Sequence, residues 1–270
     1  MIARRLLFGL AAALVALPLA MPAAAQQASM VDEVKKRGTL RVGLDTFRPW
    51  AMRAKSGEII GFEVDVAKRL AADLGVKLEV MPTAWDGIIP ALIAGKFDVI
   101  IGGMSITPAR NLTVNFTDPY ATSGVGIVAS TALAKGWTKL EDFNKPEVTI
   151  VARRATPAAQ SVARFFPKAT LRQYDAEAPA IQEVIGGRAH AMVGSVPLPA
   201  HSVKRYPDKL FVPVAEPYIK SIAGMALRKG DPDSLNLLNN WVKLRTLDGF
   251  LEERSQYWFG TLDWEDQIGN

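Results

Sequence analysis

Residues 62–101 read FEVDVAKRLAADLGVKLEVMPTAWDGIIPALIAGKFDVII. Apolar side chains at positions 62, 66, 70 and 74, with 67 and 71 beside them, have the spacing of one helix face. Gly75 can end this helix in the left-handed conformation, and a short strand is expected to follow over 77–81. A second helix over 86–94 and a strand over 98–101 repeat the pattern. This alternation predicts an α/β fold whose right-handed crossovers build a parallel sheet.

The same alternation continues on both sides of this stretch. Residues 40–44 read as a strand, and a second α/β series begins after Tyr120. Thr156 and Pro157 are typical of a helix start, as N-cap and first-turn proline. Extended runs near 121–129 and 217–224 are candidate crossings between the two series. The remaining elements expected are strands over 148–152, 170–174, 191–193 and 222–227, and helices over 179–187, 234–247 and 249–257.

The N-terminal segment has the layout of a secretory signal. Arg4 and Arg5 precede an uncharged run over 6–25 that ends in the small-x-small pattern of a cleavage site. The alternative is a membrane anchor, since about 20 apolar residues can span a bilayer. Two prolines within the run and the cleavage pattern favour removal. We therefore expect a signal peptide over 1–25, cleaved after Ala25.

Composition excludes several classes of function. The chain has no cysteine and two histidines, which excludes disulfides and thiolate sites and argues against zinc. Its formal net charge is +5, the signal removes two of the positive charges, and the other basic residues are dispersed, so nucleic-acid binding is not expected. No nucleophile motif and no glycine-rich phosphate loop occurs. We expect no metal and no cofactor.

Ligands of open α/β sheets bind beyond the carboxyl ends of the strands. Asp45, Phe47 and Trp50 follow the first strand, and Trp85 follows the second. The aromatic side chains can form a wall over a ligand, or the loop can fold back on the core. Both interpretations stay open for Trp85 as well.

The loop after the third strand offers a carboxylate site. Gly103 allows backbone to approach a ligand closely, and Ser105 adds a hydroxyl and a backbone N–H group. Thr107 and Pro108 can start a short helix, which places Arg110 near the strand end. A planar guanidinium can hold a carboxylate through two parallel hydrogen bonds. The alternative is a surface arginine that pairs with an acid. The candidate residues of this loop are Gly103, Met104, Ser105 and Arg110.

The second series supplies three further candidates. They are Arg154, Thr156 and Ser195. Arg153, Arg154 and Thr156 lie between a strand and a helix start, where free N–H groups favour anions. Of the two arginines, Arg154 is the candidate, and the alternative is that both arginines are solvated. Ser195 follows the strand over 191–193.

Four motifs in register carry a family resemblance. They are GFEVDVA at 61–67, SITPAR at 105–110, FTDPY at 116–120, and LDGF at 247–250 with YWFG at 257–260. Together they resemble family 3 of the bacterial extracellular solute-binding proteins, the polar amino-acid type, from about 30 to 260.

The resemblance implies a two-lobed periplasmic binding protein fold (type II), with two doubly wound sheets joined by two hinge strands. Lobe 1 would comprise 30–120 plus 221–262, and lobe 2 would comprise 121–220. The implied function is capture of a small carboxylate-bearing solute, an amino acid or related organic acid, in the periplasm. The partner would be an ABC permease in the inner membrane, and the protein would be a monomer without enzymatic activity.

The resemblance also assigns roles to the candidate residues. Arg110 and the Ser105 backbone would hold the carboxylate, Trp85 and the loop after the first strand would line the side-chain pocket, and the helix start at Thr156 would add a donor. Two positions depart from the family: Ser195 replaces an aspartate that holds an α-ammonium, and Arg154 replaces a glycine. Burying an ammonium without a counter-charge is costly, so we expect an anionic or zwitterionic ligand.

Two rival functions fit the same fold. A cyclohexadienyl or arogenate dehydratase-like enzyme would need a positioned acid in the cleft, and the loop over 195–199 offers none. A sensory or accessory protein with a degenerate ligand site is the other alternative.

Overall fold

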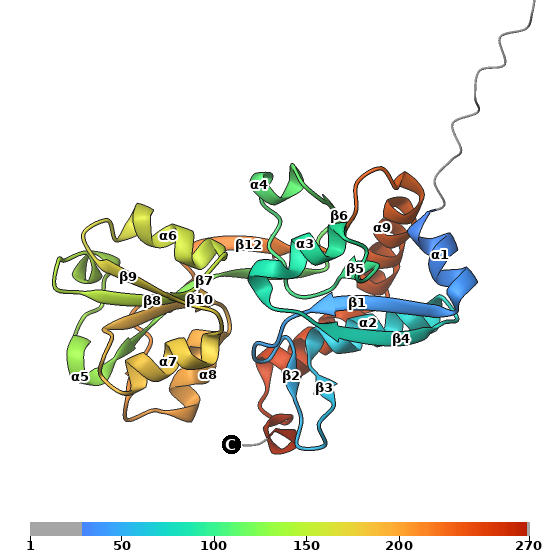
Figure 1. Cartoon of the computed structure of the whole chain (residues 1–270). Helices are drawn as coiled ribbons and strands as arrows, with labels where there is room; N and C mark the ends of the chain where they lie inside the picture. Colours follow the sequence, from blue (N-terminus) through green and yellow to red (C-terminus); the bar gives the residue numbers. More distant parts are fainter. Residues whose placement is uncertain (1–28, 269–270) are drawn as a thin grey trace, which may run out of the picture.

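The computed structural model describes residues 29–268 and consists of two α/β lobes (Figure 1). Each lobe has its own sheet with helices packed on it, as the alternation of elements predicts. The proposed signal peptide over 1–25 lies outside the described residues. Among the residues described, no helix has the length and apolar character needed to span a membrane.

The sheet of the first lobe is mixed. Strands β1 and β4 run parallel from the pair Thr39 and Lys77 to the pair Leu44 and Pro82, and β5 is also parallel to β1. The two strands at the other edge are antiparallel to their neighbours. In spatial order the strands are β4 (Lys77–Pro82), β1 (Thr39–Leu44), β5 (Val99–Ile100), β13 (Ala226–Leu227) and β6 (Asn115–Phe116).

The helix predicted from 62 onward is α2 (Phe62–Asp73), whose apolar face is buried. Gly61 precedes it with φ 138°, and a Cβ there would lie 2.3 Å from the carbonyl oxygen of Trp50, so only glycine fits. Gly75 follows it with φ 67°, which confirms the predicted left-handed end. The other helices of this lobe are α1 (Met30–Arg37), η1 (Trp85–Gly87), α3 (Ile88–Ile93), α4 (Pro108–Asn111), α9 (Pro232–Leu247), α10 (Phe250–Ser255), η3 (Gln256–Gly260) and η4 (Glu265–Gln267), beside the hairpin β2 (Met52–Arg53) and β3 (Ile59–Ile60).

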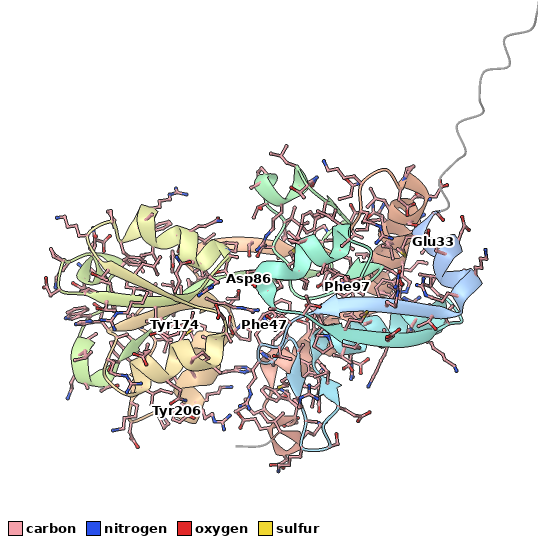
Figure 2. All side chains as sticks on the ribbon, in the orientation of Figure 1. Glu33, Phe47, Asp86, Phe97, Tyr174 and Tyr206 are labelled. Carbon is pink, nitrogen blue, oxygen red and sulfur yellow. The ribbon has the colours of Figure 1, made fainter. Side chains whose placement is uncertain are left out.

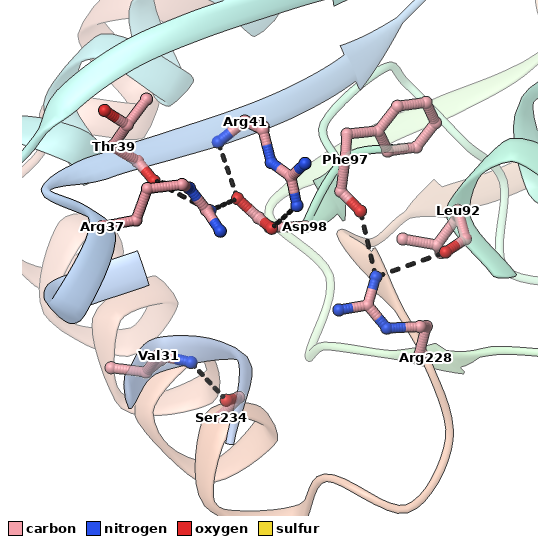
Figure 3. A network of polar contacts seen from close by, with 9 residues as sticks. All are labelled: Val31, Arg37, Thr39, Arg41, Leu92, Phe97, Asp98, Arg228 and Ser234. Carbon is pink, nitrogen blue, oxygen red and sulfur yellow. Dashed lines mark hydrogen bonds and ion pairs between the residues drawn. The ribbon is translucent and has the colours of Figure 1, made fainter. Parts of the chain in front are cut away.

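A buried carboxylate fixes the start of β1 against the start of β5 (Figure 3). Asp98 is fully buried and accepts a hydrogen bond from the backbone N–H of Arg41 at 2.8 Å and another from its guanidinium at 2.8 Å. The guanidinium of Arg37 is a second partner. Buried charges are tolerated when they are paired in this way.

The second sheet contains the long strand β7 (Ala121–Ser130), which pairs with β10 (Ala191–Ser195) on one side and with β11 (Leu210–Phe211) and β12 (Ile219–Ala223) on the other. The further strands are β8 (Thr149–Arg153) and β9 (Thr170–Tyr174). The helices are α5 (Thr131–Ala134), η2 (Leu140–Phe143), α6 (Pro157–Phe165), α7 (Glu177–Ile185) and α8 (Leu198–Arg205). Thr156 caps α6 as predicted, since its side chain accepts a hydrogen bond from the Ala159 N–H at 3.1 Å.

Strands β7 and β12 join the lobes (Figure 1). They pair antiparallel from Ala121 and Ala223 to Val125 and Ile219. The single strand predicted over 222–227 is therefore wrong. The chain divides at Gly224, where a Cβ would lie 3.1 Å from the carbonyl oxygen of Thr117, and it then enters the first sheet as β13.

Candidate ligand-binding site

Aromatic side chains of the first lobe face the second lobe. Phe47 follows β1 and lies on the flank between the lobes (Figure 2). Its ring centroid is 6.2 Å from that of Trp85 in an edge-on arrangement and 5.9 Å from that of Trp50 in a stacked one. Trp50 is 2% exposed and packs against Phe259 at 4.6 Å, so it supports Phe47 from within the core. The sequence predicts that the loop either forms an aromatic wall over a ligand or folds back on the core. For Trp50 the structure shows the second arrangement.

The glycine loop after β5 is held by a buried hydrogen-bond chain. The backbone N–H of Gly103 donates to the hydroxyl of Tyr120 at 3.1 Å, and that hydroxyl donates to a carboxyl oxygen of Glu63 at 2.7 Å. Burial raises the pKa of Glu63 to about 8, although the Tyr120 hydrogen bond opposes this. Gly103 has φ 60°, and a Cβ there would lie 3.0 Å from the Phe47 ring. Met104 is buried in the apolar core.

The side chain of Arg110 folds back onto its own loop. Thr107 caps α4 by accepting a hydrogen bond from the Arg110 N–H at 3.3 Å. The Arg110 guanidinium donates to the carbonyl oxygen of Ser105 at 2.9 Å and lies 5.5 Å from the Trp85 ring centroid. Burial lowers the pKa of Arg110 to about 10, so the side chain stays charged at neutral pH.

The second lobe contributes a backbone carbonyl to the same place. Ala155 has φ 57°, which is uncommon for a residue with a Cβ. Its carbonyl oxygen accepts hydrogen bonds from Trp85 Nε1 at 3.3 Å and from Arg110 Nη2 at 3.1 Å. The neighbouring Thr156 hydroxyl donates to the carbonyl oxygen of Arg153 at 2.7 Å. The turn before α6 is thus fixed against the aromatic wall of the first lobe.

Arg153 and Arg154 lie in opposite environments. The side chain of Arg153 is 4% exposed and forms an ion pair with Asp45 of the first lobe. Its guanidinium lies 5.0 Å from the Trp85 ring centroid and 5.6 Å from that of Phe47. Arg154 is exposed and pairs with Asp175 at 2.7 Å. Arg153, not Arg154, is therefore the arginine that the structure brings to the aromatic wall.

A buried acid of α7 lies beside this ion pair. Glu177 is in the first turn of the helix, and its Oε2 atom has no hydrogen-bond partner among the described residues. Burial raises its pKa to about 7; the charge of Arg153 opposes this shift, and that of Asp45 adds to it. Glu177 lines a cavity of about 770 Å³ between the lobes, together with Thr46 of the first lobe and Ser202 of the second.

The model of the bacterial extracellular solute-binding proteins, family 3, matches residues 40–261. The chain belongs to this family. It is 32% identical to the L-cystine-binding protein TcyJ of Escherichia coli over 86% of each chain. It is 26% identical to a cyclohexadienyl dehydratase of Pseudomonas aeruginosa, over 86% of this chain and 87% of the enzyme.

Solved structures of amino acid-binding proteins have the same fold. One is an ancestral amino acid-binding protein described as a precursor of cyclohexadienyl dehydratase, with a TM-score of 0.79 and 44% identity over 86% of this chain and all of that one. Another is the putative binding component of an ABC transporter from Wolinella succinogenes, complexed with lysine, with a TM-score of 0.80 and 39% identity over 85% and 99% of the chains. The predicted type II binding-protein fold is confirmed.

The predicted site residues of this solute-binding protein fall into four groups. Those gathered where the lobes meet are Asp45, Phe47, Trp85, Gly103, Ser105, Arg110 and Thr156. Trp50 and Met104 lie in the core behind them, and Arg154 faces solvent. Ser195 ends β10 and pairs with Val125 of the crossing strand.

Sequence reasoning omitted two charged residues from the site. The sequence does not distinguish Arg153 from Arg154, because the position at which β8 ends decides which of the two side chains faces inward. β8 extends to Arg153, one residue beyond its predicted end. Glu177 had a usable signal: it follows the carboxyl end of β9, the location where ligand-binding residues are expected. No group of three or more acidic or histidine side chains in the described part of the chain could hold a metal ion.

Proposed function

We propose that this family 3 protein captures a small carboxylate-bearing solute between its lobes and delivers it to an ABC permease in the inner membrane. The proposal rests on the burial and the hydrogen bonds of the Arg110 guanidinium. Its guanidinium is largely buried, and its hydrogen bonds in the described structure go to the carbonyl oxygens of Ser105 and Ala155. Burial lowers its pKa to about 10, and its hydrogen bonds in the described structure go to carbonyl oxygens and not to a carboxylate. A buried, charged guanidinium of this kind suits a carboxylate ligand.

The proposed lobes are 30–120 plus 221–262 and 121–220, with β7 and β12 as the hinge. The turn before Thr156 already contacts Arg110 through the Ala155 carbonyl oxygen, so a ligand held at Arg110 would lie against both lobes. A ligand shifts such a protein toward the closed conformation by as much as it binds that conformation more tightly than the open one. We place the protein in the periplasm as a monomer, after removal of residues 1–25.

We further propose an anionic or zwitterionic ligand, such as a small amino acid or a related organic acid. Ser195 supplies no negative charge for an α-ammonium group. Arg153 already occupies the Asp45 carboxylate where the lobes meet, so this acid is not available to a cationic ligand. Both features disfavour a ligand with a net positive charge.

Mass spectrometry of the small molecules that copurify with the protein, released by denaturation, tests this function. We expect a carboxylate-bearing compound, and adding it to ligand-free protein should raise the melting temperature. A panel of amino acids and dicarboxylates provides the independent test. If no carboxylate copurifies and none shifts the melting temperature, a sensory or accessory protein with a degenerate site is the better description.

A dehydratase is the second candidate function, and Glu177 is the observation that favours it. A buried carboxyl group with a pKa of about 7 can donate a proton to a leaving hydroxyl. Incubation with prephenate and arogenate distinguishes the candidates, since the binding protein should give no product. Turnover that is lost in Glu177→Gln would establish the enzyme.

A further inference from the structure

The guanidinium of Arg153 has the surroundings of a bound cation. It lies within 6 Å of two aromatic ring centroids, 5.0 Å from Trp85 and 5.6 Å from Phe47. Guanidinium groups are attracted to aromatic faces at such distances. The Asp45 carboxylate pairs with the same group. Three interactions therefore converge on one side chain that is almost completely buried.

Two acidic side chains, Asp45 and Glu177, lie beside the one arginine. The charges of Arg153 and Asp45 both act on the pKa of Glu177, whose buried Oε2 atom has no hydrogen-bond partner in the described structure. Asp45 forms the ion pair with Arg153, and Glu177 is a second acidic side chain close to the same guanidinium. Such a set of two rings and two carboxyl groups would hold the cationic end of a ligand if Arg153 were not there.

Arg153 comes from the opposite lobe to three of the groups around it, and Glu177 alone belongs to its own lobe. Asp45, Phe47 and Trp85 belong to the first lobe and follow its strands, whereas Arg153 ends β8 of the second lobe. The side chain therefore enters this set of partners from across the cleft, as a ligand would.

We propose that Arg153 is a specificity-determining residue: it fills the cation subsite of the cleft with the protein's own guanidinium and so excludes arginine-like and lysine-like ligands. This inference rests on the proposed function, because it takes the cleft to be the ligand site. It assigns the cation subsite to Asp45, Glu177, Phe47 and Trp85.

Removing the side chain should convert the specificity. In Arg153→Ala, two carboxyl groups and two ring faces lose their cation, and an external guanidinium can replace it. Arg154 is the matched control, because it is the adjacent arginine but is exposed and pairs with Asp175 instead.

Calorimetric titration with agmatine tests the proposal. Agmatine carries a guanidinium and no carboxylate, so its binding does not depend on Arg110. We expect binding to Arg153→Ala that is at least about tenfold tighter than to the wild type or to Arg154→Ala. Arginine should show the same order. Arg153→Gln, which keeps more of the packing and also removes the charge, should gain agmatine binding as well.

The results separate the two proposals. If folded Arg153→Ala and Arg153→Gln, checked by circular dichroism, gain no agmatine binding relative to Arg154→Ala, the subsite assignment is overturned. Loss of carboxylate binding in Arg110→Ala bears on the proposed function alone. Equal agmatine binding by the wild type would also contradict the inference, because the subsite would then be accessible with Arg153 in place.

Discussion

Arg153 of the second lobe and Asp45 of the first lobe form an ion pair that joins the two lobes. Both side chains are largely buried, at 4% and 19% exposed. Removing one partner of a buried pair leaves an uncompensated charge, at a cost on the order of 3 kcal/mol. Opening of the lobes would let water reach Arg153 and recover part of this cost. We therefore predict that Asp45→Asn shifts the protein toward an open conformation.

Small-angle X-ray scattering measures this shift as a larger radius of gyration. Asp175→Asn is the matched control, because it breaks the exposed pair with Arg154 and should leave the scattering unchanged. Identical profiles for Asp45→Asn and the wild type would show that the pair does not hold the lobes together.

Glu177 makes stability depend on pH. Its pKa is about 7 in the folded protein against 4.5 as the reference value, so the folded state binds the proton more tightly. The stability from this group is fully present below about pH 4.5 and is lost as the pH rises through 7. Between pH 5 and 8 we predict that the free energy of unfolding falls less in Glu177→Gln than in the wild type, by roughly 3 kcal/mol.

Urea unfolding at the two pH values provides the measurement. Glu63, whose pKa is about 8, acts in the same direction and remains in both proteins, so it cancels in the difference. A wild type and variant with the same pH slope would contradict the assignment of this titration to Glu177.

Tyr120 supports the glycine loop of the candidate site. Its hydroxyl accepts from the Gly103 N–H and donates to Glu63, and Tyr120→Phe leaves both groups without this partner. We expect a loss of about 1–3 kcal/mol in the free energy of unfolding, measured by denaturant titration. Tyr257→Phe is the control, since its hydroxyl bonds Gln267 in an exposed position. Equal effects of the two variants would mean that the buried chain contributes nothing specific.

Local signals predicted most of the fold. Thr156 and Thr107 can be predicted as helix caps because a cap depends only on nearby residues: each side chain accepts a hydrogen bond from the N–H group three residues ahead. Periodicity located α2, and Gly75 marked its end. The break between β12 and β13 was missed, because the contact of Gly224 with Thr117 joins residues far apart in sequence.

The candidate site shows the same division. Arg110 could be placed from its short distance to the cap residue and the strand end. The burial of Arg153 and Glu177 depends on how one lobe packs against the other, which no local pattern records. Trp50 and Phe47 have similar sequence context, and the packing of Trp50 against Phe62 and Phe259 shows that it lies deeper in the core.

If Arg110 anchors a carboxylate ligand between the lobes, the Arg110→Ala variant should lose affinity for that ligand, and calorimetric titration measures the loss. The titrant is the carboxylate identified by mass spectrometry or by the melting-temperature panel. Arg188→Ala serves as the control, since Arg188 pairs with Glu183 on the surface of the second lobe. We predict that Arg110→Ala weakens binding by about 2–5 kcal/mol while the control binds as the wild type does. Unchanged affinity in a folded Arg110→Ala variant would show that Arg110 does not hold the carboxylate.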